Sequence, residues 1–338
     1  MKIFIISRTN YDEPKRIRQQ LADLLAEDYD VVYCQPNTLP AKFAPNISYM
    51  KFDFINRFSS IPFVNVVNAF RLRKFIRENI AADDIIINFM PELGLINLKQ
   101  HRLIAFLNDD FSSMAPSLTK GWLEYLTKRM IDQSRHALFS SKRLLTKYAR
   151  KTPSDVFYPW ATVVPDETKL GVKRNRIVFW GYIGQHLDFD KVEELLAYIT
   201  KHDLDYSIEF FGPAEPSVNH VLNSLKSRYS KFEFYPPCGF EQLKPESIAF
   251  ALELIKPGKK FGSFIEVPNK APNFIVHGIP LVYSGIDLPK ESYFICLDFL
   301  QSLLNSSEFD KKNSVNFGGA IDFSFDARKK LLKRFLDV

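Results

Sequence analysis

The sequence predicts an α/β protein of two domains, each built on a parallel sheet, that face each other across a cleft. Three observations support this prediction. Short apolar runs typical of buried strands alternate with segments of helical periodicity. The alternation occurs twice, and a polar stretch at 165–175 with proline and glycine separates the two series. The length of 338 residues corresponds to about two domains of ~100–200 residues each.

The first series of strands and helices occupies the N-terminal half of the chain. It starts with an apolar strand at 2–7, after which Asp12 and Pro14 open an amphipathic helix with Ile17 and Leu21 at helical spacing. Further apolar strands are expected at 31–34, 84–89, 103–107 and 137–140. Parallel strands of this kind are covered by helices on both faces, so the series predicts a first domain at 1–165.

The second series repeats the same alternation after the polar stretch. Its strands are expected at 177–180, 207–211, 232–235, 248–255 and 279–283, and its helices at 190–201, 218–229 and 271–277. These elements define a second domain at 176–318. The remaining segment, 319–338, contains a basic helix at 326–338 that we expect to pack back towards the first domain. Ligands of such sheets bind beyond the carboxyl ends of the strands.

The charge of the chain excludes some partners and favours others. The net charge is +6; residues 1–165 carry 23 Lys and Arg against 16 Asp and Glu, whereas 166–338 carry 22 against 23. An excess confined to one domain indicates an anionic partner for that domain. We expect no nucleic acid, because no binding motif accompanies the charge. We also expect no membrane span, because no apolar run reaches the ~18–20 residues required.

An anionic membrane surface is the partner suggested by the segment 61–80. As a helix, it has an apolar side formed by Phe63, Val66, Val67, Phe70 and Phe75. Its basic side is formed by Arg71, Arg73, Lys74 and Arg77. Such a helix can lie on an anionic bilayer, each basic residue adding about 1 kcal/mol near the surface. A core helix with a solvated basic face explains the pattern equally well. We expect a cytoplasmic protein, and the first of these two interpretations would place it peripherally at the inner face of the cell membrane.

Glycines mark one strand-to-helix turn as a candidate anion site. The turn after the first strand reads SRTNYDEP and lacks the glycine-rich dinucleotide fingerprint, which argues against a nicotinamide cofactor there. The turn after the strand at 177–180 reads Gly181-Tyr182-Ile183-Gly184. Glycines let the backbone approach a bound group, and the following helix N-terminus favours anions. A tight turn that requires glycine for its geometry alone is an equal alternative.

The segment 262–285 is the richest in candidate binding residues. Glu266, Lys270 and Asn273 fall in a proline-bracketed loop and the first turn of a short helix. A lysine beside a helix N-terminus can hold a diphosphate by its charge together with backbone N–H groups. Asn273, about one turn on, can bond a ribose hydroxyl or a phosphate oxygen. The competing interpretation is a solvated lysine on a loop.

These segments resemble, in order along the chain, the GT-B family of nucleotide-sugar glycosyltransferases. PNKAPNFIVHGIPLV resembles the family segment P-x-K-x-x-E-Y-x-x-x-G-x-P-V-V, which grips the donor's diphosphate and ribose. RIVFWGYIGQHLDFDKVEELLAYI followed by YSIEFFGP resembles the first βαβ unit of the donor domain. Segments of the acceptor domain are similar to 16–26, 106–114 and 139–163. The similarity is greatest to bacterial exopolysaccharide and capsule enzymes, including xanthan-type glucuronosyltransferases.

The resemblance implies a fold, a donor and a binding site. The fold would be two Rossmann-like domains facing each other across a cleft (GT-B), with 1–165 binding the acceptor and 176–318 the donor. The donor, most simply a UDP-sugar, would be bound by Gly181, Tyr182, Gly184, His186, Glu241, Glu266, Asn269, Lys270 and Asn273. Glu241 and the aromatic run at 234–237 lie where the family holds the nucleotide base. Asn273 replaces the commoner acid, which leaves base and sugar open.

Asp109 and Asp110 are the candidates for the catalytic base. They follow the strand at 103–107, whose carboxyl end should face the cleft. An inverting transferase needs a carboxylate that takes a proton from the acceptor hydroxyl, and an adjacent acid or partial burial raises the pKa of such a group. The resemblance to the xanthan-type enzyme puts its base in this region. A helix N-cap is the alternative, and the sequence does not choose between the two acids.

Metal ions and cofactors are not expected. Asp188/Asp190 and Asp203/Asp205 match the D-x-D pattern that binds a metal–diphosphate in another glycosyltransferase fold, but helix capping and turn formation explain both pairs better. The six histidines form no H-E-x-x-H pattern, so zinc is unsupported. We expect a metal-independent enzyme with no cofactor, the nucleotide-sugar being a substrate.

The sequence therefore predicts a hexosyl- or glucuronosyltransferase. It would move a sugar from a nucleotide-sugar to a glycan, or to a glycan linked to a polyprenyl diphosphate, in the assembly of a surface polysaccharide. Two alternatives stay open. One is a nucleotide-sugar 2-epimerase on the same fold, and the other is a non-catalytic scaffold in a polysaccharide assembly complex.

Overall fold

The structure, a computed structural model, divides the chain into two compact units. Unit 1 comprises Met1–Tyr158 with Phe325–Val338, and unit 2 comprises Pro159–Ser324. The structure describes residues 1–13, 15–36, 38–40, 42–56, 61–163, 173–257, 266–304 and 321–336. Pro14, most of the polar stretch at 165–175, and residues 262–265 of the proline-bracketed segment lie outside the described residues.

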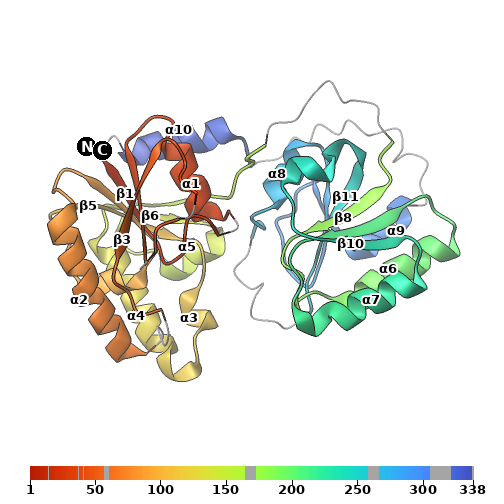
Figure 1. The fold of residues 1–338 in the computed structure, drawn as a ribbon, viewed down its shortest axis with the longest axis horizontal. Coiled ribbons are helices and arrows are strands. Elements are labelled where there is room, and N and C mark those ends of the chain that lie inside the picture. The colour runs from red at the N-terminus through yellow and green to blue at the C-terminus, as the bar shows by residue number, and fades with distance from the viewer. Residues whose placement is uncertain are drawn as a thin grey trace. The chain divides into compact units, whose positions relative to one another are not determined.

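Unit 1 is built on a parallel sheet, drawn red to yellow in Figure 1. The strand order is β3-β2-β1-β4-β5-β6-β7. The strands are β1 (Ile3–Ile6), β2 (Val31–Pro36), β3 (Ile47–Phe52), β4 (Ile85–Asn88), β5 (Arg102–Leu107), β6 (His136–Phe139) and β7 (Ser154–Val156). Every position of β1, β2 and β4 is buried, as expected for central strands covered on both faces.

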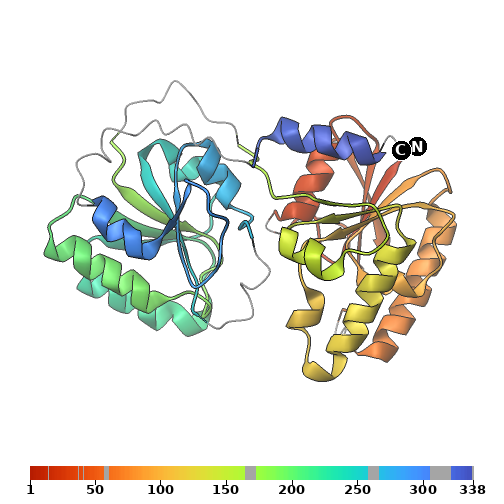
Figure 2. The same ribbon diagram turned by 180° about the vertical axis from the view of Figure 1, so that it is seen from behind.

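Helices cover the sheet of unit 1. They are α1 (Ile17–Leu25), α2 (Pro62–Asn79), η1 (Pro91–Leu95), α3 (Phe111–Met114), α4 (Ser117–Gln133), α5 (Lys142–Tyr148) and α10 (Phe325–Leu336). Leu72 and Ile76 of α2 share one core cluster with Phe4 and Ile6 of β1. The terminal helix α10, blue in Figures 1 and 2, contacts α1, and its Lys329 forms a 2.9 Å ion pair with Glu27.

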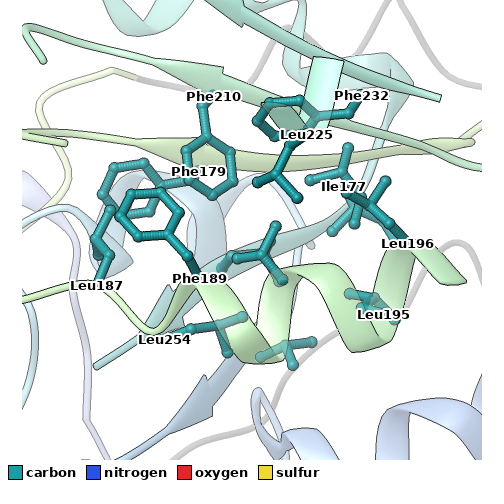
Figure 3. Packing of buried hydrophobic residues seen from close by; sticks show 14 of the residues in the cluster. Ile177, Phe179, Leu187, Phe189, Leu195, Leu196, Phe210, Leu225, Phe232 and Leu254 are labelled. Carbon is teal, nitrogen blue, oxygen red and sulfur yellow. The ribbon is translucent and has the colours of Figure 1, made fainter. Parts of the chain in front are cut away.

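Unit 2 is a second parallel sheet with helices on its faces, and its strand order is β10-β9-β8-β11-β12-β13. The strands are β8 (Arg176–Trp180), β9 (Ser207–Phe211), β10 (Phe232–Tyr235), β11 (Ile248–Leu254), β12 (Leu281–Ser284) and β13 (Phe294–Cys296). The helices are α6 (Phe189–Lys201), η3 (Pro216–Val218), α7 (Asn219–Arg228), η4 (Phe240–Leu243), η5 (Pro245–Ser247), α8 (Ala271–Val276) and α9 (Leu297–Leu304). Figure 3 shows Leu195 and Leu196 of α6 facing Ile177 of β8 in the core.

The strand order of both sheets fixes where a ligand can bind. In unit 1 the order reverses between β1 and β4, and in unit 2 between β8 and β11. At such a reversal the loops that follow the two strands diverge to opposite faces and leave a crevice at their carboxyl ends. The segments after β1, β4, β5, β8 and β11 are therefore the places to look for a site.

The structure differs from the sequence prediction at the sheet edges and at one helix start. The strands β3, β7 and β13 were not predicted. β3 has exposed and half-buried positions, and β7 and β13 have only three residues each, so none gives a strong apolar signal. Helix α1 begins at Ile17 with Arg16 as its N-cap, and Asp12 lies in a preceding turn.

Helix α2 corrects the prediction of one continuous apolar side at 61–80. Phe75 is buried in the core, whereas Phe63 and Phe70 are 74% and 66% exposed. The basic residues Arg71, Arg73, Lys74 and Arg77 are exposed as well. The helix is therefore anchored by one face and presents isolated aromatic rings beside positive charges on the other. Across the described part of the chain, no helix is both long and apolar enough to cross a membrane.

Candidate functional site

Asp109 and Asp110 follow β5 at the carboxyl edge of the unit 1 sheet, as predicted. β5 ends at Leu107, and α3 begins at Phe111. The two neighbouring side chains have opposite surroundings. The side chain of Asp109 is 46% exposed, whereas that of Asp110 is 3% exposed. This difference separates two acids that the sequence alone could not separate.

Asp110 is the N-cap of α3 and is surrounded by hydrogen-bond donors. Its Oδ1 accepts hydrogen bonds from the Tyr148 hydroxyl at 2.6 Å and the Ser112 hydroxyl at 2.8 Å. Its Oδ2 accepts from Lys147 Nζ at 2.6 Å, and the Ser113 hydroxyl also donates to it. Burial alone would raise the pKa of Asp110, but the donors outweigh it and lower the pKa to about 2. These contacts match the N-cap alternative and favour a structural role.

In the described part of the chain, neighbouring side chains contact only one of the two carboxylate oxygens of Asp109. Its Oδ2 accepts a hydrogen bond from Asn108 Nδ2 and lies 3.5 Å from a guanidinium nitrogen of Arg18. Among the residues that the structure describes, none donates a hydrogen bond to its Oδ1. An exposed carboxylate with one oxygen held and the other open can accept a proton from a bound hydroxyl group. Of the two candidate acids, Asp109 is therefore the one with an exposed, open carboxylate oxygen.

A second buried network lies at the reversal of strand order in unit 1. Arg8, directly after β1, is paired with the fully buried Glu92 of η1. Glu92 Oε1 also accepts from Asn65 Nδ2 at 3.1 Å, and Asn65 Oδ1 accepts from Trp122 Nε1 at 2.8 Å. The network joins the β1 loop to η1, α2 and α4. It was not predicted, because its members come from four separate segments.

In unit 2 the structure brings Gly181 and Lys270 together. Gly181 follows β8 at the reversal of strand order, and Lys270 is the N-cap residue of α8. A Cβ atom on Gly181 would collide with Lys270 Nζ, so the absent side chain leaves room for the ammonium group. Lys270 Nζ also lies 5.6 Å from the ring centroid of Phe179. The sequence singled out both residues, and the fold places the charge at the glycine turn.

The rest of the glycine turn is organised by Glu215, a residue that the sequence analysis missed. Glu215 accepts hydrogen bonds from the Ser217 hydroxyl at 3.0 Å and the Gln185 backbone N–H at 3.4 Å. A Cβ atom on Gly184 would lie 2.8 Å from Glu215 Oε1. Glu215 lies in the turn after β9, following Gly212, Pro213 and Ala214. A glycine- and proline-containing turn at the end of a strand could have indicated Glu215 as a candidate site residue.

Tyr182 and His186 stand on this turn with their rings stacked. The ring centroids are 6.2 Å apart and the planes differ by 3°. Burial lowers the pKa of His186, the charge of Lys270 lowers it further, and Glu215 opposes both. The imidazole is therefore neutral at pH 7 and can both donate and accept a hydrogen bond. Both residues were predicted to contact the donor.

Glu253 adds an unpredicted acid near Lys270. It is the penultimate residue of β11 and lies opposite Tyr283 of β12. Burial raises the pKa of Glu253, and the charge of Lys270 opposes this shift. The sequence analysis did not identify Glu253, because a single acidic residue within an apolar strand matches no motif.

The other predicted donor residues are placed in different ways. Glu266 and Asn273 are buried, and Asn269 is exposed just before Lys270. Asn273 Oδ1 accepts a hydrogen bond from the Thr162 backbone N–H at 2.8 Å, so this oxygen is already engaged within unit 2. Glu241 is exposed on η4.

The two D-x-D pairs have the roles expected of caps and turns. Asp188 is the N-cap of α6 and accepts a hydrogen bond from the Lys191 backbone N–H at 3.3 Å. Asp203 has a positive φ of 47° in the turn before β9. Within the described ranges, no three His, Cys, Asp or Glu side chains are grouped as metal ligands would be.

Comparison with known proteins gives matches in structure alone. No family model and no curated protein sequence matches the chain. Among solved structures, WaaG, a glycosyltransferase involved in lipopolysaccharide biosynthesis, superposes with a TM-score of 0.68 at 11% identity, covering 98% of this chain and 99% of that one.

Two further structures cover both chains completely. The UDP-forming α,α-trehalose-phosphate synthase of Burkholderia xenovorans, in complex with glucose-6-phosphate, has a TM-score of 0.68 at 10% identity over 100% of each chain. HepE of Anabaena, in complex with UDP, has a TM-score of 0.65 at 13% identity over 100% of each chain. Identities this low establish the fold alone. The chain thus has the two-domain, Rossmann-like α/β fold of the GT-B glycosyltransferases.

Proposed function

We propose that this protein is a glycosyltransferase that moves a sugar from a UDP-sugar to a glycan acceptor. The observation that carries the proposal is the ammonium group of Lys270 seated at the Gly181 turn, at the reversal of strand order in unit 2. A cation beside backbone N–H groups and a helix N-terminus suits a nucleotide diphosphate. UDP is favoured because HepE, a protein of the same fold, was solved with UDP bound.

In the proposed reaction, unit 2 binds the donor and unit 1 supplies the base. The acceptor hydroxyl oxygen attacks the anomeric carbon, the bond from that carbon to the diphosphate oxygen breaks, and UDP leaves with the electron pair. Asp109 takes the proton of the hydroxyl group through its open Oδ1. Lys270 offsets the negative charge that develops on the departing diphosphate, and His186 donates a hydrogen bond to it. The reaction as proposed uses no metal ion.

The proposal includes a surface polysaccharide as the product and leaves two sugar classes to experiment. The resemblance to xanthan-type enzymes supports a glucuronosyl donor, whereas the glucose found with UDP in a second HepE complex supports a hexosyl donor. The 2-epimerase and the scaffold are not favoured, because the structural neighbours named above are described as sugar-transferring or UDP-binding proteins.

Calorimetric titration tests the donor site. UDP should bind and GDP, CMP and dTDP should bind weakly or not at all; UDP-glucose and UDP-glucuronate then separate the sugar classes. Lys270→Ala should weaken UDP binding by ~10–100-fold, because a hydrogen bond to a charged group contributes about 1.5–3 kcal/mol. Lys201→Ala, at an exposed position in the last turn of α6, is the matched control and should bind UDP as the wild type does. Equal UDP affinity in both variants would remove Lys270 from the site.

We further propose that the acceptor is a lipid-linked glycan met at an anionic membrane surface. Most exposed large apolar side chains of the described residues belong to unit 1: Met1, Leu39, Phe43, Ile61, Phe63, Phe70, Leu118 and Tyr125. Phe63 and Leu118 stand in the first turns of α2 and α4, which follow β3 and β5. In the described part of unit 2, Tyr182 and Tyr235 are the corresponding exposed rings. Apolar rings beside Arg71 and Lys74 fit an anionic bilayer.

Vesicle sedimentation tests this contact. The protein should sediment with phosphatidylglycerol–phosphatidylcholine vesicles at low salt and less so at high salt, because screening weakens the basic contribution. Phe63→Ser with Phe70→Ser should abolish sedimentation, since both rings are exposed and their loss costs the fold little. Tyr235→Ser on unit 2 is the control. Wild-type sedimentation of the double variant would contradict the proposal.

A further inference from the structure

Arg18 is a buried guanidinium beside the proposed base. It lies on α1 and is 8% exposed, whereas the flanking Arg16 is exposed. Burial lowers the pKa of Arg18, and the charge of Asp109 opposes this shift. A charge this deeply buried needs partners that replace its water shell. The partners of the Arg18 guanidinium therefore indicate its role.

The guanidinium of Arg18 joins the loops that follow β1 and β5. One nitrogen donates to the Thr9 hydroxyl in the β1 loop. The other donates to Asn108 Oδ1 at 3.1 Å and lies 3.5 Å from Asp109 Oδ2. Asn108 closes the arrangement, because its Nδ2 donates to the same Asp109 oxygen. The planar fork of an arginine can span these partners, whereas the single nitrogen of a lysine cannot.

We infer that Arg18 is a positioning residue that, together with Asn108, fixes the carboxylate of Asp109 and leaves its Oδ1 open towards the acceptor. The inference rests on the proposed function. Arg18 acts on Oδ2 alone, and the proton is taken at Oδ1. Freedom of the carboxylate to rotate would spread the reactive oxygen over several positions, and a displacement of about 1 Å can cost ~100-fold in rate.

Two other roles for Arg18 give different kinetics. If the guanidinium bound the donor diphosphate, its loss would weaken UDP binding. If it served only the packing of α1, its loss would lower the unfolding temperature, and the rate of the remaining folded protein would be unchanged. A positioning role lowers the rate of the chemical step in folded protein with unchanged affinity for UDP.

The test measures UDP release from UDP-glucose with water as the acceptor, alongside UDP titration and thermal unfolding. Arg18→Gln should slow release by ~100-fold and Arg18→Lys by ~10-fold, with the Kd for UDP unchanged. Arg16→Gln is the matched control and should behave as the wild type. If Arg18→Gln fails to fold, Asn108→Ala keeps the buried charge, removes the bridge and should slow release by ~10-fold.

A double variant isolates the dependence on Asp109. In an Asp109→Glu background, whose longer side chain no longer meets Arg18 as before, adding Arg18→Gln should slow release by less than ~3-fold, as expected for residues that act as a unit. A full ~100-fold loss in that background, unchanged release in Arg18→Gln, or weaker UDP binding would each overturn the inference. If the wild type released UDP from no UDP-sugar while folded, the proposed function itself would fail.

Discussion

The two units share the order of six strands, to which unit 1 adds β7, but they differ in the groups at their carboxyl edges. In unit 1 the charges at this edge are paired: Arg8 with Glu92, Arg18 with Asp109, and Lys147 with Asp110. In unit 2 the edge is formed by a glycine turn with the ammonium group of Lys270 above it. A shared topology therefore decides where a site lies, and the residues at the edge decide its chemistry.

The comparison also explains the uneven net charge. The positive excess of residues 1–165 does not come from Arg8, Arg18 and Lys147 at the edge of unit 1, because each of these three cations has an acidic partner. It lies on outer faces such as that of α2, where Arg71, Arg73 and Arg77 are exposed. Unit 2 carries 17 Lys and Arg against 21 Asp and Glu, a net charge of −4, yet it holds the proposed diphosphate site. Affinity there depends on the placement of one lysine rather than on the field of the domain.

The largest expected effect comes from Asp109 in unit 1. Asp109→Asn removes the proton acceptor and should slow UDP release from UDP-glucose by ~1,000-fold, within the 10²–10⁴ range of general-base catalysis. Titration with UDP should give the wild-type Kd, because the proposed donor site is in unit 2. Rapid-quench or coupled assays measure the release. Release at the wild-type rate would exclude Asp109 as the base. It would also contradict the proposal that unit 1 supplies the base while unit 2 binds the donor.

The next effect separates Asp110 from its neighbour. Because the folded-state pKa is about 2 and the unfolded value is ~3.9, ionised Asp110 stabilises unit 1 above pH ~4, and this stabilisation is lost as the pH falls towards ~2. Asp110→Asn should thus lower the free energy of unfolding of unit 1 by about 2 kcal/mol at pH 7. Hydrogen exchange of unit 1 amides measures this value.

The pH dependence and a matched pair in unit 2 serve as controls for Asp110. At pH 3 the wild type and Asp110→Asn should differ by less than at pH 7, since the carboxyl group of the unfolded wild-type chain, with a pKa of ~3.9, is then largely protonated while the folded one stays mostly ionised. Asp205→Asn breaks the exposed pair with Lys173 and should leave the stability of unit 2 nearly unchanged, because solvent screens such a pair. Equal effects of the two substitutions would show that burial of the Asp110 network contributes nothing.

The sequence was sufficient for the parts of the fold that are continuous in the chain. Strands such as β4 and β11 are apolar runs buried on both faces, so composition alone marks them. β3 was missed because it reads ISYMKF, a mixed pattern typical of a strand near an edge. The α/β fold with two Rossmann-like units is confirmed.

The candidate site could be predicted only where a motif carried it. Gly181 and Lys270 were found from a turn and a helix start, but their contact needed the fold. Arg18 lies in a polar helix start and looks solvated in the sequence; its burial follows from Asn108, which is 90 positions further along. Asn273 was predicted to bind ribose, and its partner Thr162 is 111 positions away. Contacts of this kind depend on tertiary packing, which local patterns do not encode.

The smallest expected effect tests the glycine turn of unit 2. Gly181→Ala places a methyl group where Lys270 Nζ lies, and the flexible lysine side chain can move aside at little cost. Stability should change by less than ~1 kcal/mol, whereas the displaced ammonium group should weaken UDP binding by ~5-fold.

Gly212→Ala is the contrasting variant. Gly212 has a φ of 154°, and its Cβ would collide with the backbone oxygen of Gly181. Gly212→Ala should lower both the stability of unit 2 and the affinity for UDP, because the backbone of Gly181 cannot move away as a flexible side chain can. If Gly181→Ala bound UDP as the wild type does, the ammonium group would not need its place at the turn. Only the paired charges of unit 1 would then remain as a functional feature that distinguishes the two carboxyl edges.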